Sequence, residues 1–203
     1  MIGIVNYGCG NTNAFVNSFK RLNIPSIVTS QIDEIIKLKK IILPGVGAFD
    51  YVIRKFNQSG LREAIQDRVF IDKIDVLGVC AGMQIFANKS EEGKEKGLGW
   101  IDGEVKLFDS KKINQTTKLP HMGWNTVEIV ENPLFKGIPQ KALFYFVHSY
   151  FYENYDQVNM IGHSEYGIQF TSAINKNNIY GVQFHPEKSH ENGQKLLKNF
   201  ANL

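Results

Sequence analysis

The sequence predicts an α/β fold, with an open, mostly parallel central sheet flanked by helices and an additional antiparallel β-rich portion. The first half alternates short apolar strands with amphipathic helices, which is typical of a parallel sheet covered on both faces. From Trp100 to Gln183, many β-rich segments are separated by Gly, Asn and Asp turns, which favours antiparallel pairing. A length of 203 residues suits one substantial core, so residues 1–203 are assigned to a single domain.

The elements of the first half follow from short apolar runs and from apolar residues that recur at helical spacing. The expected strands are Ile2–Val5, Ser26–Thr29, Ile41–Leu43 and Asp75–Val79. The expected helices are centred on Phe15 to Leu22, on Phe49 to Phe56 and on Leu61 to Ile71. Pro44 is expected to stop the third strand, because proline has no N–H group to give to a sheet.

The second half is expected to be mainly strands, closed by one helix over His190–Leu203. Leu196, Leu197 and Phe200 give that helix its apolar side. The expected strands are Glu104–Phe108, Thr126–Val130, Leu143–Tyr152, Ile168–Ile174 and Ile179–Phe184.

Composition excludes several classes of function. The 23 Lys and Arg residues against 20 Asp and Glu give a net charge of only +3, and they are scattered, so nucleic-acid binding is not expected. No apolar run approaches the roughly 18 residues of a membrane span, and no basic leader precedes Ile2, so we expect a soluble protein. Two cysteines do not make a disulfide framework in a chain of this length, which fits a reducing cytoplasm.

Cys80 lies in the segment Gly78–Gln84, directly after the apolar pair Val76–Leu77. The flanking glycines predict a strand, a sharp turn and a helix start, which is the arrangement of a nucleophile elbow. A cysteine there faces the positive end of a helix dipole, which favours the nucleophilic thiolate. The alternative is a free cysteine of the core, but that interpretation does not explain the glycines.

His185, Pro186 and Glu187 end a second apolar strand far downstream. Pro186 disfavours the helical region for His185, and in an extended chain residues two apart point to the same side. Glu187 is therefore predicted to lie on the face of His185 and to orient its ring. A thiol, a base and a carboxylate at strand ends form a catalytic set.

The segment Pro44–Phe49 also follows a buried strand, and its two glycines let the backbone approach a ligand closely. Main-chain N–H groups at Val46 and Gly47, together with that of Ala81, are predicted to form an oxyanion hole. An ordinary strand-to-helix turn is the alternative. Because ligands in open α/β sheets bind beyond the carboxyl ends of strands, the three loops are expected to converge on one crevice.

Other motifs are weaker. Gly8–Gly10 invites comparison with a dinucleotide fingerprint, but Asn13 stands where the third glycine belongs, so we reject it, and no cofactor is expected. No metal site is predicted, since C-x-x-C and H-E-x-x-H are absent. The Glu91–Lys96 run is typical of a solvated loop; the alternative is that one of its carboxylates faces the crevice and pairs with a substrate ammonium group. Structural or interface roles are expected for His121, His148 and His163.

Four ordered motifs resemble the class I glutamine amidotransferases and, among them, the family of glutaminase subunits of imidazole glycerol phosphate synthase. The resemblance covers nearly the whole chain. The motifs are Pro44–Phe49, Pro120–Asn125, Tyr145–Tyr150 and Gln183–Ser189.

The resemblance implies a role for each matching residue. Cys80 would be the nucleophile, His185 the general base and then acid, and Glu187 the orienting carboxylate. The matching positions that would hold L-glutamine are Gln84, Glu92, Ser149 and Tyr150. Those that would lie toward a partner are His121, Trp124, Asn125 and Lys188.

The resemblance further implies a partner, a (β/α)₈-barrel cyclase in a heterodimer that receives ammonia through a sheltered path for histidine biosynthesis. Two departures stand out, since Ala81 replaces the family's usual Leu and His190 replaces the Gly of many members. The second leaves open a paralogous glutaminase that serves the amidation of a surface sugar.

Two further alternatives belong to other classes of protein. An α/β-hydrolase also has a G-x-C-x-G elbow, but its acid normally precedes the histidine, whereas Glu187 follows His185. A non-catalytic binding subunit with the same fold is disfavoured by the intact set of Cys80, His185 and Glu187.

Overall fold

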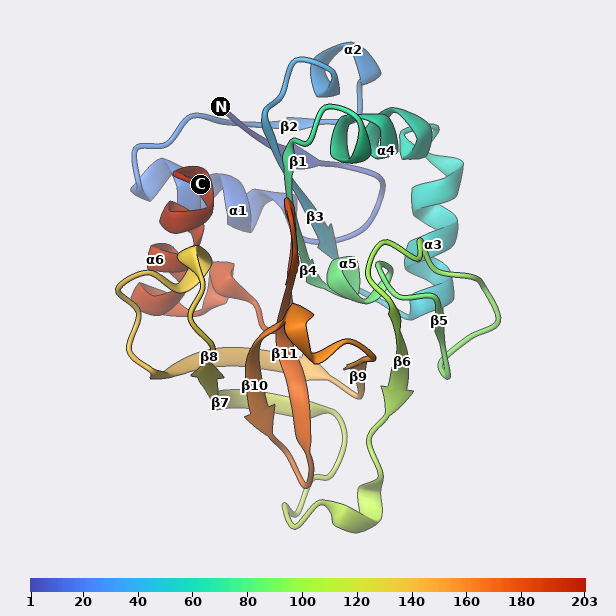
Figure 1. Cartoon of the computed structure of the whole chain (residues 1–203), viewed down its shortest axis with the longest axis vertical. Coiled ribbons are helices and arrows are strands. Elements are labelled where there is room, and N and C mark those ends of the chain that lie inside the picture. Colours follow the sequence, from blue (N-terminus) through green and yellow to red (C-terminus); the bar gives the residue numbers. More distant parts are fainter.

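The computed structural model describes all 203 residues, Met1–Leu203. Twelve strands form one sheet, whose main path runs β2-β1-β3-β4-β12-β11-β10-β7-β8 (Figure 1). The expected α/β class with a central sheet flanked by helices is confirmed. No helix is long and apolar enough to cross a membrane.

The first half forms the parallel part of the sheet, in which β1 pairs with β2 and β3, and β4 pairs with β3 and β12. Its strands are β1 Ile2–Val5, β2 Ser26–Thr29, β3 Lys40–Gly45, β4 Asp75–Cys80 and, from the far end of the chain, β12 Ile179–Val182. The helices are α1 Thr12–Arg21, α2 Ile32–Ile35, α3 Phe49–Gln58, α4 Arg62–Phe70, α5 Ala81–Gln84 and α6 His190–Ala201.

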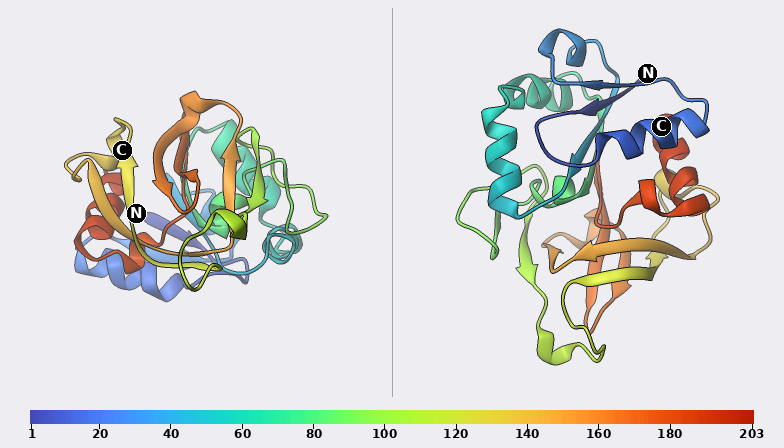
Figure 2. Two further views of the ribbon diagram at one scale, coloured as in Figure 1. Left: turned by 90° about the horizontal axis from the view of Figure 1, so that it is seen from below. Right: turned by 180° about the vertical axis from the view of Figure 1, so that it is seen from behind.

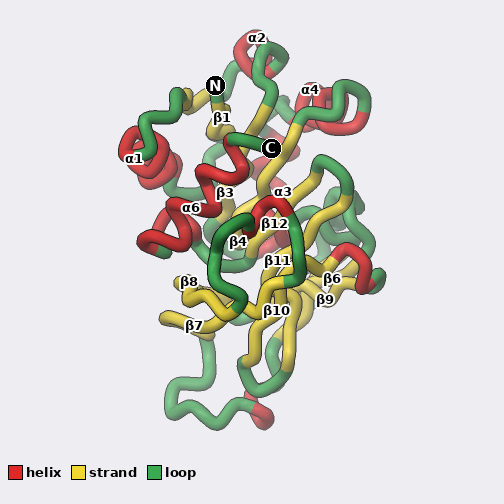
Figure 3. The backbone as a smooth tube through the Cα atoms, turned by 60° about the vertical axis from the view of Figure 1, so that its left-hand side comes forward, coloured by secondary structure: helices red, strands yellow, loops and turns green.

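The second half is antiparallel apart from the short β5–β6 pair, as expected from its turn pattern. Its strands are β5 Lys89–Ser90, β6 Gly103–Leu107, β7 His121–Ile129, β8 Lys141–His148, β9 Tyr150–Asn154, β10 Met160–Glu165 and β11 Gln169–Lys176. Short 3₁₀ turns are η1 Ser110–Lys112, η2 Pro133–Phe135, η3 Gln157–Asn159 and η4 Pro186–Lys188. The segment around η1 projects from the end of the molecule that carries β7 and β10 (Figure 3).

Helices cover both faces of the parallel part. Helices α1 and α6 lie side by side on one face, while α3 and α4 lie on the other (Figures 1 and 2). Phe15, Phe19 and Phe200 belong to a buried cluster of 29 residues on the first side, which continues under the β7–β8 pair. Phe49 and Ile65 belong to a second buried cluster of 27 residues on the other side.

Three expected boundaries were wrong. Strand β3 continues through Pro44, because beyond Ile42 it pairs only with β4, so the missing proline N–H interrupts no ladder with β1. The expected strand over 143–152 is two strands separated at Ser149. Strand β7 begins at His121, five residues before the expected start, and β10 was not expected at all.

Candidate active site

Cys80 is the last residue of β4 and directly precedes α5, with φ 55° and ψ −117°. A positive φ is strained for a non-glycine residue, and it turns the side chain sharply out of the strand. The flanking glycines allow close packing here, since a Cβ on Gly82 would lie 1.9 Å from the Leu43 carbonyl oxygen. A Cβ on Gly78 would lie 2.6 Å from the Gly82 carbonyl oxygen.

His185 follows β12, and its Nδ1 lies 2.8 Å from Oε1 of Glu187. His185 is extended, with φ −100° and ψ 94°, as expected before proline. The chain then forms the 3₁₀ turn η4, so Glu187 reaches the ring by this turn and not by the strand alternation that we expected. Both side chains are buried, 4% and 3% exposed.

Three effects set the charge of His185. Burial by itself lowers the pKa of the imidazole, but the Cys80 sulfur and the Glu187 carboxylate outweigh it and raise the pKa to about 10. The ring is therefore protonated at neutral pH. Its Nε2 is buried and has no hydrogen-bond partner, which leaves this N–H available to a reacting group.

A pocket of about 240 Å³ joins the three loops. The residues predicted from the sequence as nucleophile, base, oxyanion hole and substrate site all line this pocket. Glu187 does not line it, because it lies behind His185. Two lining residues, Val147 and His148, were not predicted, although they directly precede Ser149 in one of the four motifs. The lining residues are Val46, Gly47, Cys80, Ala81, Gln84, Glu92, Val147, His148, Ser149, Tyr150, His185 and Lys188.

Gln84 is buried, and its amide nitrogen donates to the Tyr150 carbonyl and to Oε1 of Gln183, both at 3.0 Å. Since an amide NH₂ has two hydrogens, both are used within the protein. Gln84 can therefore offer only its carbonyl oxygen, an acceptor, to a molecule in the pocket.

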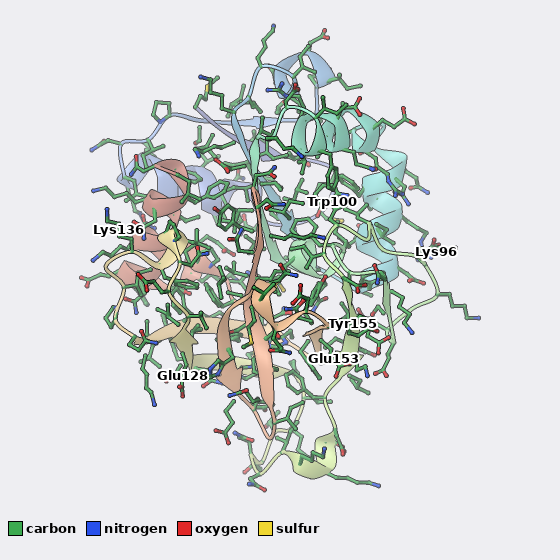
Figure 4. All side chains as sticks on the ribbon, in the orientation of Figure 1. Lys96, Trp100, Glu128, Lys136, Glu153 and Tyr155 are labelled. Carbon is green, nitrogen blue, oxygen red and sulfur yellow. The ribbon has the colours of Figure 1, made fainter.

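Glu92 is the carboxylate of the Glu91–Lys96 run that faces the pocket, whereas Lys96 extends into solvent (Figure 4). Burial raises the pKa of Glu92, partly offset by the Phe49 N–H, which donates to Oε2 at 2.7 Å. Asp50 fixes the loop by accepting from the backbone N–H groups of Lys94 and Glu95, at 3.0 Å each.

The loop after β3 is fixed at both ends and open in the middle. The buried Tyr7 hydroxyl donates to the Pro44 carbonyl at 2.5 Å, and Glu92 accepts from Phe49 at the start of α3. Between these anchors Val46 is 53% exposed and Gly47 has φ 121°. The N–H groups of Val46 and Gly47 donate to no backbone carbonyl, so they remain available as donors.

The residues of β7 that were expected to face a partner lie on opposite sides of the strand, because neighbouring residues of a strand alternate in direction. His121 is only 4% exposed, and its Nδ1 lies 3.0 Å from Nε2 of His148, so its ring does not present itself to a partner as expected. Asn125 is bound internally and donates to the Glu165 carbonyl at 2.9 Å. Trp124, on the opposite side of β7, is 47% exposed.

The outer side of the β7–β8 pair carries an apolar face, here called the hairpin face. It consists of Met122, Trp124, Leu143, Tyr145 and Val147. Trp124 stacks on the ring of His190 at 5.0 Å between centroids, and the Lys188 ammonium lies 5.7 Å from the Tyr145 ring. Since Val147 and Lys188 also line the pocket, the hairpin face continues directly from it.

No group of three or more His, Cys, Asp or Glu side chains is placed to hold a metal ion. Cys9 is buried and free, and it lies outside the pocket lining.

Residues 4–203 match the family model described as glutamine amidotransferase class-I. A solved structure described as a glutamine amidotransferase superposes with a TM-score of 0.76 at 16% identity, covering 100% of this chain and 99% of that one. The structure of PurLQS from Thermotoga maritima gives a TM-score of 0.71 at 17% identity, covering 99% and 97%. The fold and the match define the class, that of class I glutamine amidotransferases.

Curated relatives narrow the assignment. An imidazole glycerol phosphate synthase subunit HisH from Bdellovibrio bacteriovorus is 48% identical over 204 residues, covering 100% of both chains. A subunit HisH 2 from Methanococcus maripaludis is 43% identical, covering 98% of both. The chain belongs to this HisH family of imidazole glycerol phosphate synthase subunits, and the resemblance inferred from the four motifs is confirmed.

Proposed function

We propose that the chain is a single glutaminase domain over residues 1–203 in which Cys80, His185 and Glu187 hydrolyse L-glutamine to glutamate and ammonia. One observation carries the proposal, namely that Cys80 and His185 line one pocket while Glu187 holds the other side of the histidine ring. The raised pKa of His185 supports a protonated imidazole in the pocket, and a neighbouring positive charge favours the nucleophilic form of a cysteine.

The proposed chemistry proceeds in two halves. The Cys80 thiolate bonds to the carboxamide carbon, and the C=O electrons form an oxyanion that is stabilised by backbone N–H groups at Val46, Gly47 and Ala81. The oxyanion collapses, the C–N bond breaks, and His185 donates its proton to the leaving nitrogen, which gives ammonia. Water, deprotonated by His185, then attacks the thioester, so that glutamate leaves and the thiolate returns.

The substrate has complementary groups on the pocket wall. Glu92 would bind the α-ammonium group of glutamine, and the backbone at Ser149 and Tyr150 would bind its α-carboxylate. Gln84 would accept a hydrogen bond through its free carbonyl oxygen. The internal hydrogen bonds of the buried Gln84 and the partly buried Glu92 support such roles, because fixed groups bind without losing side-chain entropy.

We further propose that a (β/α)₈-barrel cyclase docks on the hairpin face through Trp124 and Lys188 and receives the ammonia. Free ammonia is protonated in neutral water and loses its nucleophilicity, so a sheltered route between two active sites is required. The exposed apolar face beside the pocket supports this site of docking. Rotation of the Val46 peptide on docking would complete the oxyanion hole, which predicts a weak glutaminase in the isolated chain.

The decisive experiment separates assembly from hydrolysis. Cys80→Ser should abolish release of glutamate from glutamine while the chain still binds the histidine-pathway cyclase of the same cell. A variant that still hydrolyses glutamine would overturn the assignment of the nucleophile. Copurification from a cytoplasmic extract also identifies the acceptor, since a sugar-modifying partner in place of the cyclase would favour the paralogous function.

A further inference from the structure

The end of β12 places a buried amide next to the reactive cysteine. Strands β4 and β12 run parallel with Val79 opposite Val182, so the next residues along, Cys80 and Gln183, are neighbours. Gln183 has 0% exposure, and its Nε2 lies 3.7 Å from Cys80 Sγ, within reach of a hydrogen bond to sulfur. The glutaminase chemistry described above gives this side chain no role.

Hydrogen bonds join the buried amides of Gln84 and Gln183 in a chain that ends at the Cys80 sulfur, and each group donates to the next. Gln84 donates both of its hydrogens, one of them to Oε1 of Gln183, which fixes the amide of Gln183 with its nitrogen toward the sulfur. Gln183 Nε2 then donates to Cys80. A buried polar group is costly unless it is bonded; Gln84 satisfies the carbonyl oxygen of Gln183, and the sulfur is the partner of its NH₂ group.

The same network extends away from the sulfur. The Tyr150 carbonyl, which accepts from Gln84, also accepts from Nδ1 of His148 at 2.7 Å. His148 is in turn bonded to His121 at 3.0 Å. Burial lowers the pKa of both rings, to about 3 for His148 and about 4 for His121, so both are neutral at pH 7. The neutral rings of His121 and His148 thus fix the Tyr150 carbonyl, which in turn holds the amide of Gln84.

We propose that Gln183 is a further catalytic residue, whose amide N–H holds the Cys80 sulfur in its attacking position and stabilises the negative charge on it. The inference rests on the proposed glutaminase function and adds a donor to it. The bond would act on the thiolate that attacks the carboxamide, and again on the thiolate that leaves when the thioester is hydrolysed. Gln183 lies outside the pocket lining and touches two lining residues, Cys80 through its Nε2 and Gln84 through its Oε1. Its own N–H group is directed at the nucleophile, so its direct action is on the sulfur.

The test compares Gln183→Met with Gln84→Met in the complex with the cyclase subunit. Methionine has nearly the volume of glutamine and removes the polar atoms from either site. Gln183→Met is expected to lower kcat about 10- to 100-fold, since hydrogen bonds to charged groups contribute about 1.5–3 kcal/mol, with KM for glutamine changed less than threefold. Gln84→Met is expected to raise KM instead, because Gln84 lines the pocket.

A second measurement does not depend on glutamine or on the partner. The rate at which iodoacetamide alkylates Cys80 at a fixed pH, followed by mass spectrometry of its peptide, should fall about tenfold or more in Gln183→Met. Thermal unfolding establishes that each variant is folded. Equal alkylation rates in folded wild type and Gln183→Met would overturn the inference and leave the proposed function intact, whereas an active Cys80→Ser chain would overturn the proposed function itself.

Discussion

The histidines of this protein show how burial and neighbours set the charge of a single residue. His185 lies between a sulfur and a carboxylate, which raise its pKa to about 10 against the effect of burial. Burial lowers the pKa values of His121 and His148, and for His148 the charges of His121 and His185 act in the same direction. Histidine is thus charged at position 185 and neutral at positions 121 and 148, where its rings form hydrogen bonds within the protein.

The buried pair makes stability depend on pH. Because their folded pKa values lie below the unfolded value of 6.5, the unfolded chain takes up protons first as the pH falls. The stability that depends on neutral His121 and His148 is fully present above pH 6.5 and is lost as the pH falls toward 4 for His121 and toward 3 for His148. We expect the free energy of unfolding, measured with urea, to decrease from pH 7 to pH 5.

The variant His121→Gln serves as the control for this prediction. It removes one of the two titrating groups, so its unfolding free energy should change less between pH 7 and pH 5. Glu104, whose pKa is held at about 2 by Lys89 and Lys106, loses its stabilising contribution only below about pH 4.5, so that contribution is constant in this range. A wild-type stability that is constant from pH 7 to 5 would contradict the prediction.

At the scale of elements, the pocket depends on how closely α5 packs on β3. Gly82 in α5 and Gly45 in β3 touch backbone to backbone, since a Cβ on Gly45 would lie 2.1 Å from the Gly82 nitrogen. This approach sets the elbow of Cys80 beside the Pro44–Phe49 loop. Glycine is required because any side chain would separate the two elements.

Gly82→Ala is therefore expected to destabilise the fold by about 2–4 kcal/mol, because the added methyl meets the Leu43 carbonyl oxygen at 1.9 Å and backbone must move. Gly60→Ala is the control. Nothing lies within 4 Å of its added Cβ, and its φ of 73° alone should cost about 1–2 kcal/mol. Urea unfolding measures both, and a smaller loss for Gly82→Ala than for Gly60→Ala would exclude this account of the packing.

At the scale of the whole molecule, β11 and β12 join the parallel half to the antiparallel half in one sheet. His185 at the end of β12 is fixed to the second half, since its N–H donates to the Tyr145 carbonyl on β8 at 2.9 Å. The hairpin face and the pocket therefore belong to one continuous structure. A partner bound to the hairpin face would lie close to the residues that surround Cys80.

We expect Trp124→Ala to weaken association with the cyclase by about 30-fold or more, because large aromatic anchors dominate such interfaces. Titration calorimetry measures the Kd. Ile71→Ala is the control, since Ile71 is 71% exposed but follows α4 at the opposite end of the molecule from β7 (Figure 1). A Kd that is unchanged by Trp124→Ala would place the docking surface elsewhere.

Much of the fold and of the site was predictable because local patterns were consistent. Apolar runs and helical spacing predicted the first four parallel strands within two residues, and glycines around Cys80 predicted its sharp turn. Gln183 was part of a recognised motif, yet nothing in its own neighbourhood along the chain pointed to Cys80, 103 residues away. The burial of His121 follows from which side of β7 faces the core. The sequence did not predict that side at His121, because the strand was expected to begin only at Thr126.

The order of residues by itself determined which side chains stand at strand ends, since propensity, turn chemistry and periodicity act between near neighbours. It thereby determined the α/β class and the residues that we propose as the catalytic set. Only the tertiary structure decided that His185 is charged and His148 neutral, that Gln183 faces the sulfur, and that β7 buries His121 and exposes Trp124. Burial and electrostatic coupling depend on strand register and on contacts between distant segments, which no local pattern contains.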